Sequence, residues 1–96
     1  MQLPVKAKVW VWNGPQSWHF VTIPKKFSKI ITDNFGESKR GFGSIRVQVS
    51  VGESKWKTSI FPMKEGTFVL PLKAQIRKEE KIKAGKTLSF LLIIDV

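Results

Sequence analysis

Lys73 and Arg77 are candidates for binding an anion. They stand four residues apart in the segment LPLKAQIR, so in a helix both side chains would lie on one face and could hold the same anion. Alternatively, Arg77 bonds Glu80 or backbone carbonyls and holds the turn in place. In the first interpretation, Trp18, Trp56, Thr58 and Ser59 could line a pocket near these two residues, although Trp56 suits the core equally well. The sequence leaves both interpretations open.

A second group of candidates combines tryptophan with basic side chains. Residues 5–12 alternate, which places Trp10 and Trp12 on the strand face of Lys6 and Lys8, opposite a valine face that suits the core. Beside such charges the two rings could stack on nucleic-acid bases. Alternatively, the face is solvated and a loop or helix covers the tryptophans. Other basic residues that we expect outside the core are Lys39, Arg40, Arg46, Lys55 and Lys57.

The sequence contains no recognisable catalytic or metal-binding constellation. It has no cysteine, which excludes disulfides, thiolate metal sites and cysteine nucleophiles. His19 is the only histidine, and no second metal ligand stands at a known spacing from it. A phosphate-binding loop would need Lys-Ser/Thr after Gly41, whereas Phe42-Gly43 follows. We expect no enzyme activity, no cofactor and no metal.

Composition and charge set the remaining limits. With 96 residues, 42% of them hydrophobic, the chain can build one core, and we expect one domain spanning residues 1–96. The net charge of +10 attracts polyanions, although charge can also serve solubility alone. No apolar run approaches the roughly 18 residues of a membrane span, and the N-terminus lacks a signal-peptide pattern. A soluble cytoplasmic protein without membrane contact is the expectation.

Six or seven short strands and two short helices would position these residues. The clearest strand is 44–51, with Ile45, Val47, Val49 and Val51 facing inward. Pro24 suits the first turn of a helix. Phe27, Ile30 and Ile31 follow at helical spacing and would form its buried stripe. The segment 73–81 predicts one or two further helical turns. We therefore expect an all-β, mainly antiparallel small barrel.

The two halves of the chain follow the same plan. Residues 5–51 and 54–94 each contain two strands, a helix, a loop and a closing strand. The second strand ends at Ile23-Pro24 in one half and at Leu70-Pro71 in the other. This pattern predicts a degenerate duplication with a pseudo-two-fold axis, a double-split barrel that leaves few open edges. Because a duplication could make the chain its own dimer, we favour a monomer.

Four short blocks occur in one order and cover most of the chain from Trp18 onward. They are Trp18-x-Phe20-Val21-x-Ile23-Pro24, Arg40-Gly41-x-Gly43, Trp56-x-Thr58-Ser59-Ile60-Phe61-Pro62 and Leu70-Pro71-Leu72-Lys73-Ala74-x-Ile76-Arg77. With these blocks the chain resembles the DUF1905 family, which implies a small β-barrel without an established activity. The C-terminal piece, with Pro71, Arg77 and Gly85, is more loosely similar to the swapped-hairpin motif of AbrB/MazE-type DNA-binding proteins.

Two functional hypotheses follow. The first is a non-catalytic binding or scaffold module whose basic surface engages nucleic acid or another polyanion. The second is a small-molecule-binding barrel that holds an anionic ligand near Arg77 and Lys73.

Overall fold

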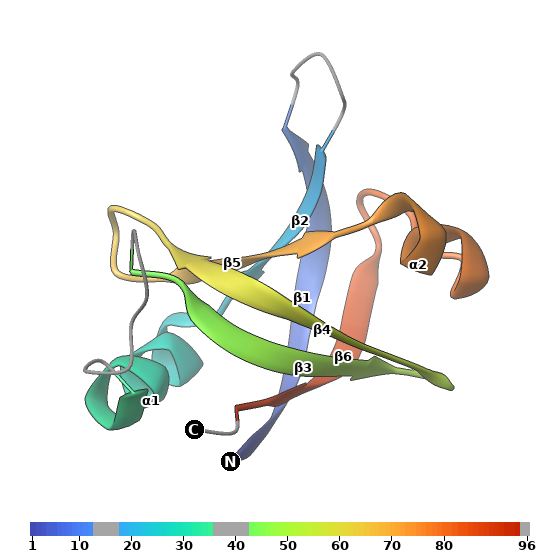
Figure 1. The fold of residues 1–96 in the computed structure, drawn as a ribbon. Coiled ribbons are helices and arrows are strands. Elements are labelled where there is room, and N and C mark those ends of the chain that lie inside the picture. Colours follow the sequence, from blue (N-terminus) through green and yellow to red (C-terminus); the bar gives the residue numbers. More distant parts are fainter. Residues whose placement is uncertain (13–17, 36–42, 95–96) are drawn as a thin grey trace.

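The strands close into a barrel. The computed structural model describes residues 1–12, 18–35 and 43–94. These residues form six strands and two helices: β1 (Gln2–Trp12), β2 (Trp18–Ile23), α1 (Lys25–Phe35), β3 (Ile45–Val51), β4 (Ser54–Pro62), β5 (Phe68–Leu72), α2 (Ala74–Glu79) and β6 (Thr87–Ile93). The order around the barrel is β1-β2-β5-β4-β3-β6, and all neighbours are antiparallel (Figure 1). The predicted all-β small barrel is confirmed.

The period-2 alternation of the strands builds the core. Val47 and Val49 of β3 are buried, as are Trp56 and Ile60 of the neighbouring β4. Alternate side chains of a strand point to opposite faces, so one face of each strand fills the barrel. From β5, Leu70 has no exposed surface, and Phe68 and Leu72 are also buried.

The strand order agrees with the predicted duplication. Exchanging β1, β2 and β3 with β4, β5 and β6 leaves every neighbour relation of the barrel unchanged. In each half the first strand also changes its pairing partner midway. β1 pairs with β6 up to Lys8 and with β2 from Val9 onward, and β4 pairs with β3 up to Ile60 and with β5 from Phe61 onward. The two helices occupy equivalent places and lie at opposite sides of the barrel (Figure 1).

Helix α1 packs on the barrel through a different stripe from the predicted one. Ile31 is fully buried and Phe27 half-buried, but Ile30 is 37% exposed, so its predicted burial is wrong. Ser28 is buried in its place. Its hydroxyl donates to the Ile23 carbonyl at 3.0 Å and accepts from the Phe68 amide at 3.2 Å. The buried face is turned toward Ser28 because this hydroxyl joins α1 to β2 and β5.

Replacing Ser28 with alanine is expected to lower the free energy of unfolding by about 1–3 kcal/mol, because a buried amide and carbonyl lose their partner. Urea denaturation measures the change. The exposed Ser89 supplies the matched control, and Ser89→Ala is expected to stay within about 0.5 kcal/mol of the parent. Equal stability of the two variants would contradict the bridging role of Ser28.

Neither α1, with 11 residues, nor α2, with six, meets the length and hydropathy of a membrane-crossing helix, and no other helix occurs in the described residues.

Candidate functional site

Four aromatic side chains form a cluster on the outer side of the β1–β2 hairpin, which we call the aromatic face. In the antiparallel register Trp10 lies opposite Phe20, and Trp12 lies opposite Trp18. Directly opposed side chains of a strand pair lie within contact distance on one face of the sheet. The valine positions of β1 point inward, with Val5 and Val9 buried, so these four rings point outward.

The rings of the aromatic face form two layers with different exposure. The Trp10 and Phe20 centroids are 5.0 Å apart, and the Trp10 Nε1 donates to Thr22 Oγ1 at 2.9 Å. Trp18 lies on the Phe20 ring with a centroid distance of 6.1 Å and an angle of 16° between the rings. Trp12 is 55% exposed and Trp18 48% exposed. The inner pair is therefore fixed on the barrel, whereas the outer pair presents ring surface to solvent.

This exposure bears on the question that the sequence left open. Cover by a helix would hide both outer rings, and roughly half of each remains accessible. Lys6 and Lys8 are exposed on the same face of β1. Trp12 and Trp18 are thus exposed on the outer face of β1 and β2, and the two lysines lie nearer the start of β1.

The first two strands of the second half separate and leave a small hollow, the seam pocket. β4 pairs with β5 only at Phe61 and Pro62, although β4 begins at Ser54. The hollow measures about 120 Å³. Its lining residues are Trp18, Trp56, Thr58, Pro71, Leu72 and Lys73. Four of the residues predicted to form an anion site (Trp18, Trp56, Thr58 and Lys73) therefore meet here.

Arg77 does not line the seam pocket and has internal partners. Its Nε donates to the Leu72 carbonyl at 3.1 Å, and its Nη1 lies 3.4 Å from His19 Nε2. Of the two interpretations of Arg77 from the sequence, this geometry agrees with the one in which Arg77 bonds a backbone carbonyl. The carboxylate of Glu80 bonds the Ser54 hydroxyl instead, at 2.6 Å. Arg77 therefore ties the start of α2 to the end of β5 and to β2.

The remaining predicted site residues lie elsewhere. Lys73 is the N-cap residue of α2, with extended backbone, so it precedes the helix whose face it was predicted to share with Arg77. Ser59 lies opposite Arg46 in the β3–β4 pairing and is not among the residues of the seam pocket. Lys39 and Arg40 fall outside the described residues.

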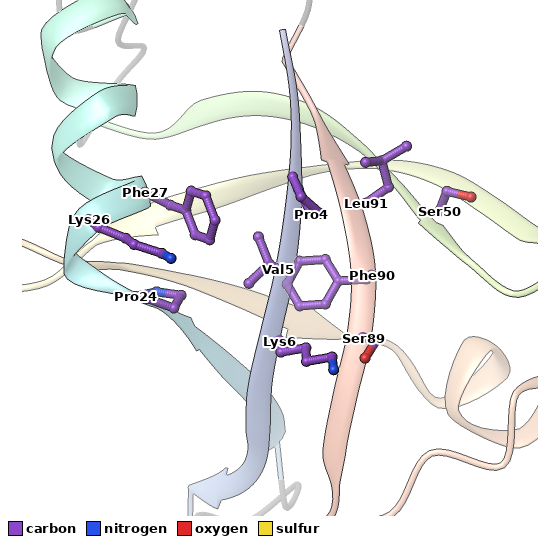
Figure 2. Close-up of a pocket in the computed structure, with 10 residues that line it drawn as sticks. All are labelled: Pro4, Val5, Lys6, Pro24, Lys26, Phe27, Ser50, Ser89, Phe90 and Leu91. Carbon is purple, nitrogen blue, oxygen red and sulfur yellow. The ribbon is translucent and has the colours of Figure 1, made fainter.

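A larger, open groove of about 700 Å³ lies between α1 and the strands β1 and β6 (Figure 2). Figure 2 shows the Phe27 ring between α1 and β1, and the Lys26 ammonium lies 4.9 Å from the centroid of that ring. The groove residues are Pro4, Val5, Lys6, Pro24, Lys26, Phe27, Ser50, Ser89, Phe90 and Leu91. Sequence reasoning missed it, because its walls come from four separate segments. The one available signal was the repeated Pro-x-Lys, since Pro24 and Lys26 correspond to Pro71 and Lys73 of the seam pocket.

Comparison with known proteins gives a family and no activity. Residues 6–92 match the family model described as a domain of unknown function, DUF1905. No curated protein matches the chain. Within the described residues, no group of three or more His, Cys, Asp or Glu side chains could hold a metal ion.

Proposed function

The chain belongs to the DUF1905 family, and we propose that it is a non-catalytic module that binds single-stranded nucleic acid on the aromatic face. The observation behind this proposal is the pair of half-exposed rings, Trp12 and Trp18, on the outside of a closed barrel, with the exposed Lys73 near Trp18 in the lining of the seam pocket.

Stacking of nucleic-acid bases on the exposed rings is the interaction that we assign to the aromatic face. Every base has a flat π-face, so an exposed aromatic ring binds single strands with little dependence on sequence. The contact of Trp18 with Phe20 and the hydrogen bond of Trp10 to Thr22 hold the underlying rings in place. A supported ring loses little conformational freedom when a base stacks on it, which favours binding.

The charge of the protein supplies the second part of the interaction. Within the described part of the chain, Lys29–Asp33 on α1 is the only ion pair, at 3.0 Å. The exposed Lys6, Lys8 and Lys73 therefore have no carboxylate partner there. Lys73 also lines the seam pocket together with Trp18. A phosphate backbone next to stacked bases would meet these unpaired ammonium groups.

Salt dependence tests the proposal. A fluorescently labelled dT oligonucleotide is expected to bind at low ionic strength and to lose affinity steeply with added salt, because phosphate contacts release counterions. If three phosphates are neutralised, the slope of log K against log salt is about −2, so a fourfold increase in salt lowers the affinity roughly 20-fold. Fluorescence anisotropy measures this.

Two comparison ligands separate stacking from charge. A DNA duplex of the same sequence content hides its bases, and poly-glutamate has none, so both are expected to bind more weakly than the single strand at equal charge. Equal competition by poly-glutamate would show that bases contribute nothing. Absence of salt-sensitive binding to any of the three ligands would remove nucleic acid as a partner.

A further inference from the structure

The seam pocket contains a buried hydrogen-bond donor for which the described residues provide no acceptor. Trp56 is only 8% exposed, and its Nε1 lacks a hydrogen-bond partner among them. An indole nitrogen can donate but cannot accept. Buried polar groups in folded proteins are nearly always paired, so the exception calls for an acceptor that the described chain itself does not supply.

The other polar groups of the pocket point to the chemistry of that acceptor. Lys73 brings an ammonium group and Thr58 a hydroxyl, and no lining residue is acidic. Pro71 has no amide hydrogen, and the Leu72 carbonyl already accepts from Arg77 Nε. The polar side chains of the lining can therefore all donate a hydrogen bond, and one of them carries a positive charge. A group that only accepts and carries negative charge matches this set.

We propose that the seam pocket binds a small oxyanion, with the Trp56 Nε1, the Thr58 hydroxyl and the Lys73 ammonium as its donors. The pocket measures about 120 Å³, which is the space of roughly four water molecules. A carboxylate with a short apolar group, or an inorganic phosphate, fits this size, whereas a nucleotide does not. Trp18 and Pro71 provide an apolar wall for a methyl group.

This site adjoins the aromatic face, but its buried donor belongs to neither layer of that face. Trp56 points into the barrel from β4 and is buried, whereas Trp12 and Trp18 are half exposed on the outside. Lys73 and Trp18 border both regions, so Trp56 is the residue that reports on the pocket alone.

The indole signals of the ¹⁵N-labelled protein test the proposal directly. The chain has four tryptophans, and Trp56→Phe identifies the signal of Trp56; Trp12→Phe, Trp18→Phe and Trp10→Phe identify it by elimination if Trp56→Phe does not fold. Sodium acetate and sodium phosphate are titrated separately, against sodium chloride at equal ionic strength. The Trp56 signal is expected to shift saturably with acetate, phosphate or both, and the responding salt identifies the source of the oxyanion.

A matched pair of lysine variants completes the experiment. Lys73→Gln removes the charge at the pocket, and Lys57→Gln removes one on the outward face of β4. Lys73→Gln is expected to weaken binding about tenfold, because a hydrogen bond to a charged group is lost, whereas Lys57→Gln leaves it unchanged. A Trp56 signal that responds to chloride as it does to the oxyanions, that does not respond at all, or that responds equally in both variants would overturn the proposal.

Discussion

Leu70→Ala is expected to lower the free energy of unfolding by about 2–5 kcal/mol, the range for a large apolar side chain deleted from a packed core. Leu70 has no exposed surface, and it lies in the middle of β5, two residues before the strand ends at Leu72. Val21 lies opposite it on β2 and is equally buried. The surrounding barrel can therefore collapse only partly into the cavity, which places the loss well above that of an average substitution.

Urea denaturation followed by circular dichroism measures the loss. Ile30→Ala is the matched control, because it also shortens an aliphatic side chain but at a position that is 37% exposed on α1. That variant is expected to stay within about 0.5 kcal/mol of the parent. A loss below about 1 kcal/mol for Leu70→Ala would mean that the barrel is not closed around this residue as described.

The double variant Trp12→Ala/Trp18→Ala is expected to lose affinity for a dT oligonucleotide by at least a factor of 30. Each stacked base contributes about 1–3 kcal/mol by alanine substitution, and the variant removes both outer rings of the aromatic face. Because the exposed rings contribute little to the core, the barrel should remain folded. Fluorescence anisotropy at low salt measures the affinity, and the circular dichroism spectrum checks the fold.

Trp12→Phe/Trp18→Phe is the conservative counterpart, since it keeps a flat ring at both positions and should retain most of the affinity. Ile30→Ala removes exposed apolar surface on α1, which lies apart from the end of β1 and the start of β2 (Figure 1), and should bind as the parent does. If the alanine double variant binds as tightly as the phenylalanine one, the aromatic face is not where the strand binds.

The architecture of the barrel was largely accessible from the sequence, because two local signals determine it. Strict alternation in segments such as 44–51 fixes which side chains fill the barrel. The repeated Ile23-Pro24 and Leu70-Pro71 steps lie at equivalent places in the two halves: β2 ends at Ile23, whereas β5 continues through Pro71 to Leu72. The observed strand order keeps the symmetry that this repeat predicts.

Packing that depends on a polar contact was not accessible in the same way. Hydrophobic periodicity assigns Ile30 to the buried stripe of α1, yet the buried position belongs to Ser28. The reason is a hydroxyl that satisfies two backbone groups from other strands, Ile23 O and Phe68 N. A pattern of apolar residues has no information on where such backbone groups will be left without partners.

The candidate sites also combine features that the sequence predicted with features that only the folded barrel creates. Alternation pointed to tryptophans on a basic face. The spacing of Lys73 and Arg77 suggested an anion site, with Trp18 and Trp56 as possible walls of a pocket near it. The separation of β4 from β5 is a property of the closed barrel, since it depends on where β4 exchanges β3 for a new partner. For that reason neither the seam pocket nor the unpartnered Trp56 donor could be derived from residue spacing.

The most direct test of the account is the response of the four indole signals to a saturating dT oligonucleotide in two-dimensional NMR. Base stacking on the aromatic face predicts the largest shifts at Trp12 and Trp18, with a smaller one at Trp10, whose Nε1 is bonded to Thr22. Unchanged signals of Trp12 and Trp18 in the presence of bound oligonucleotide would contradict the central claim.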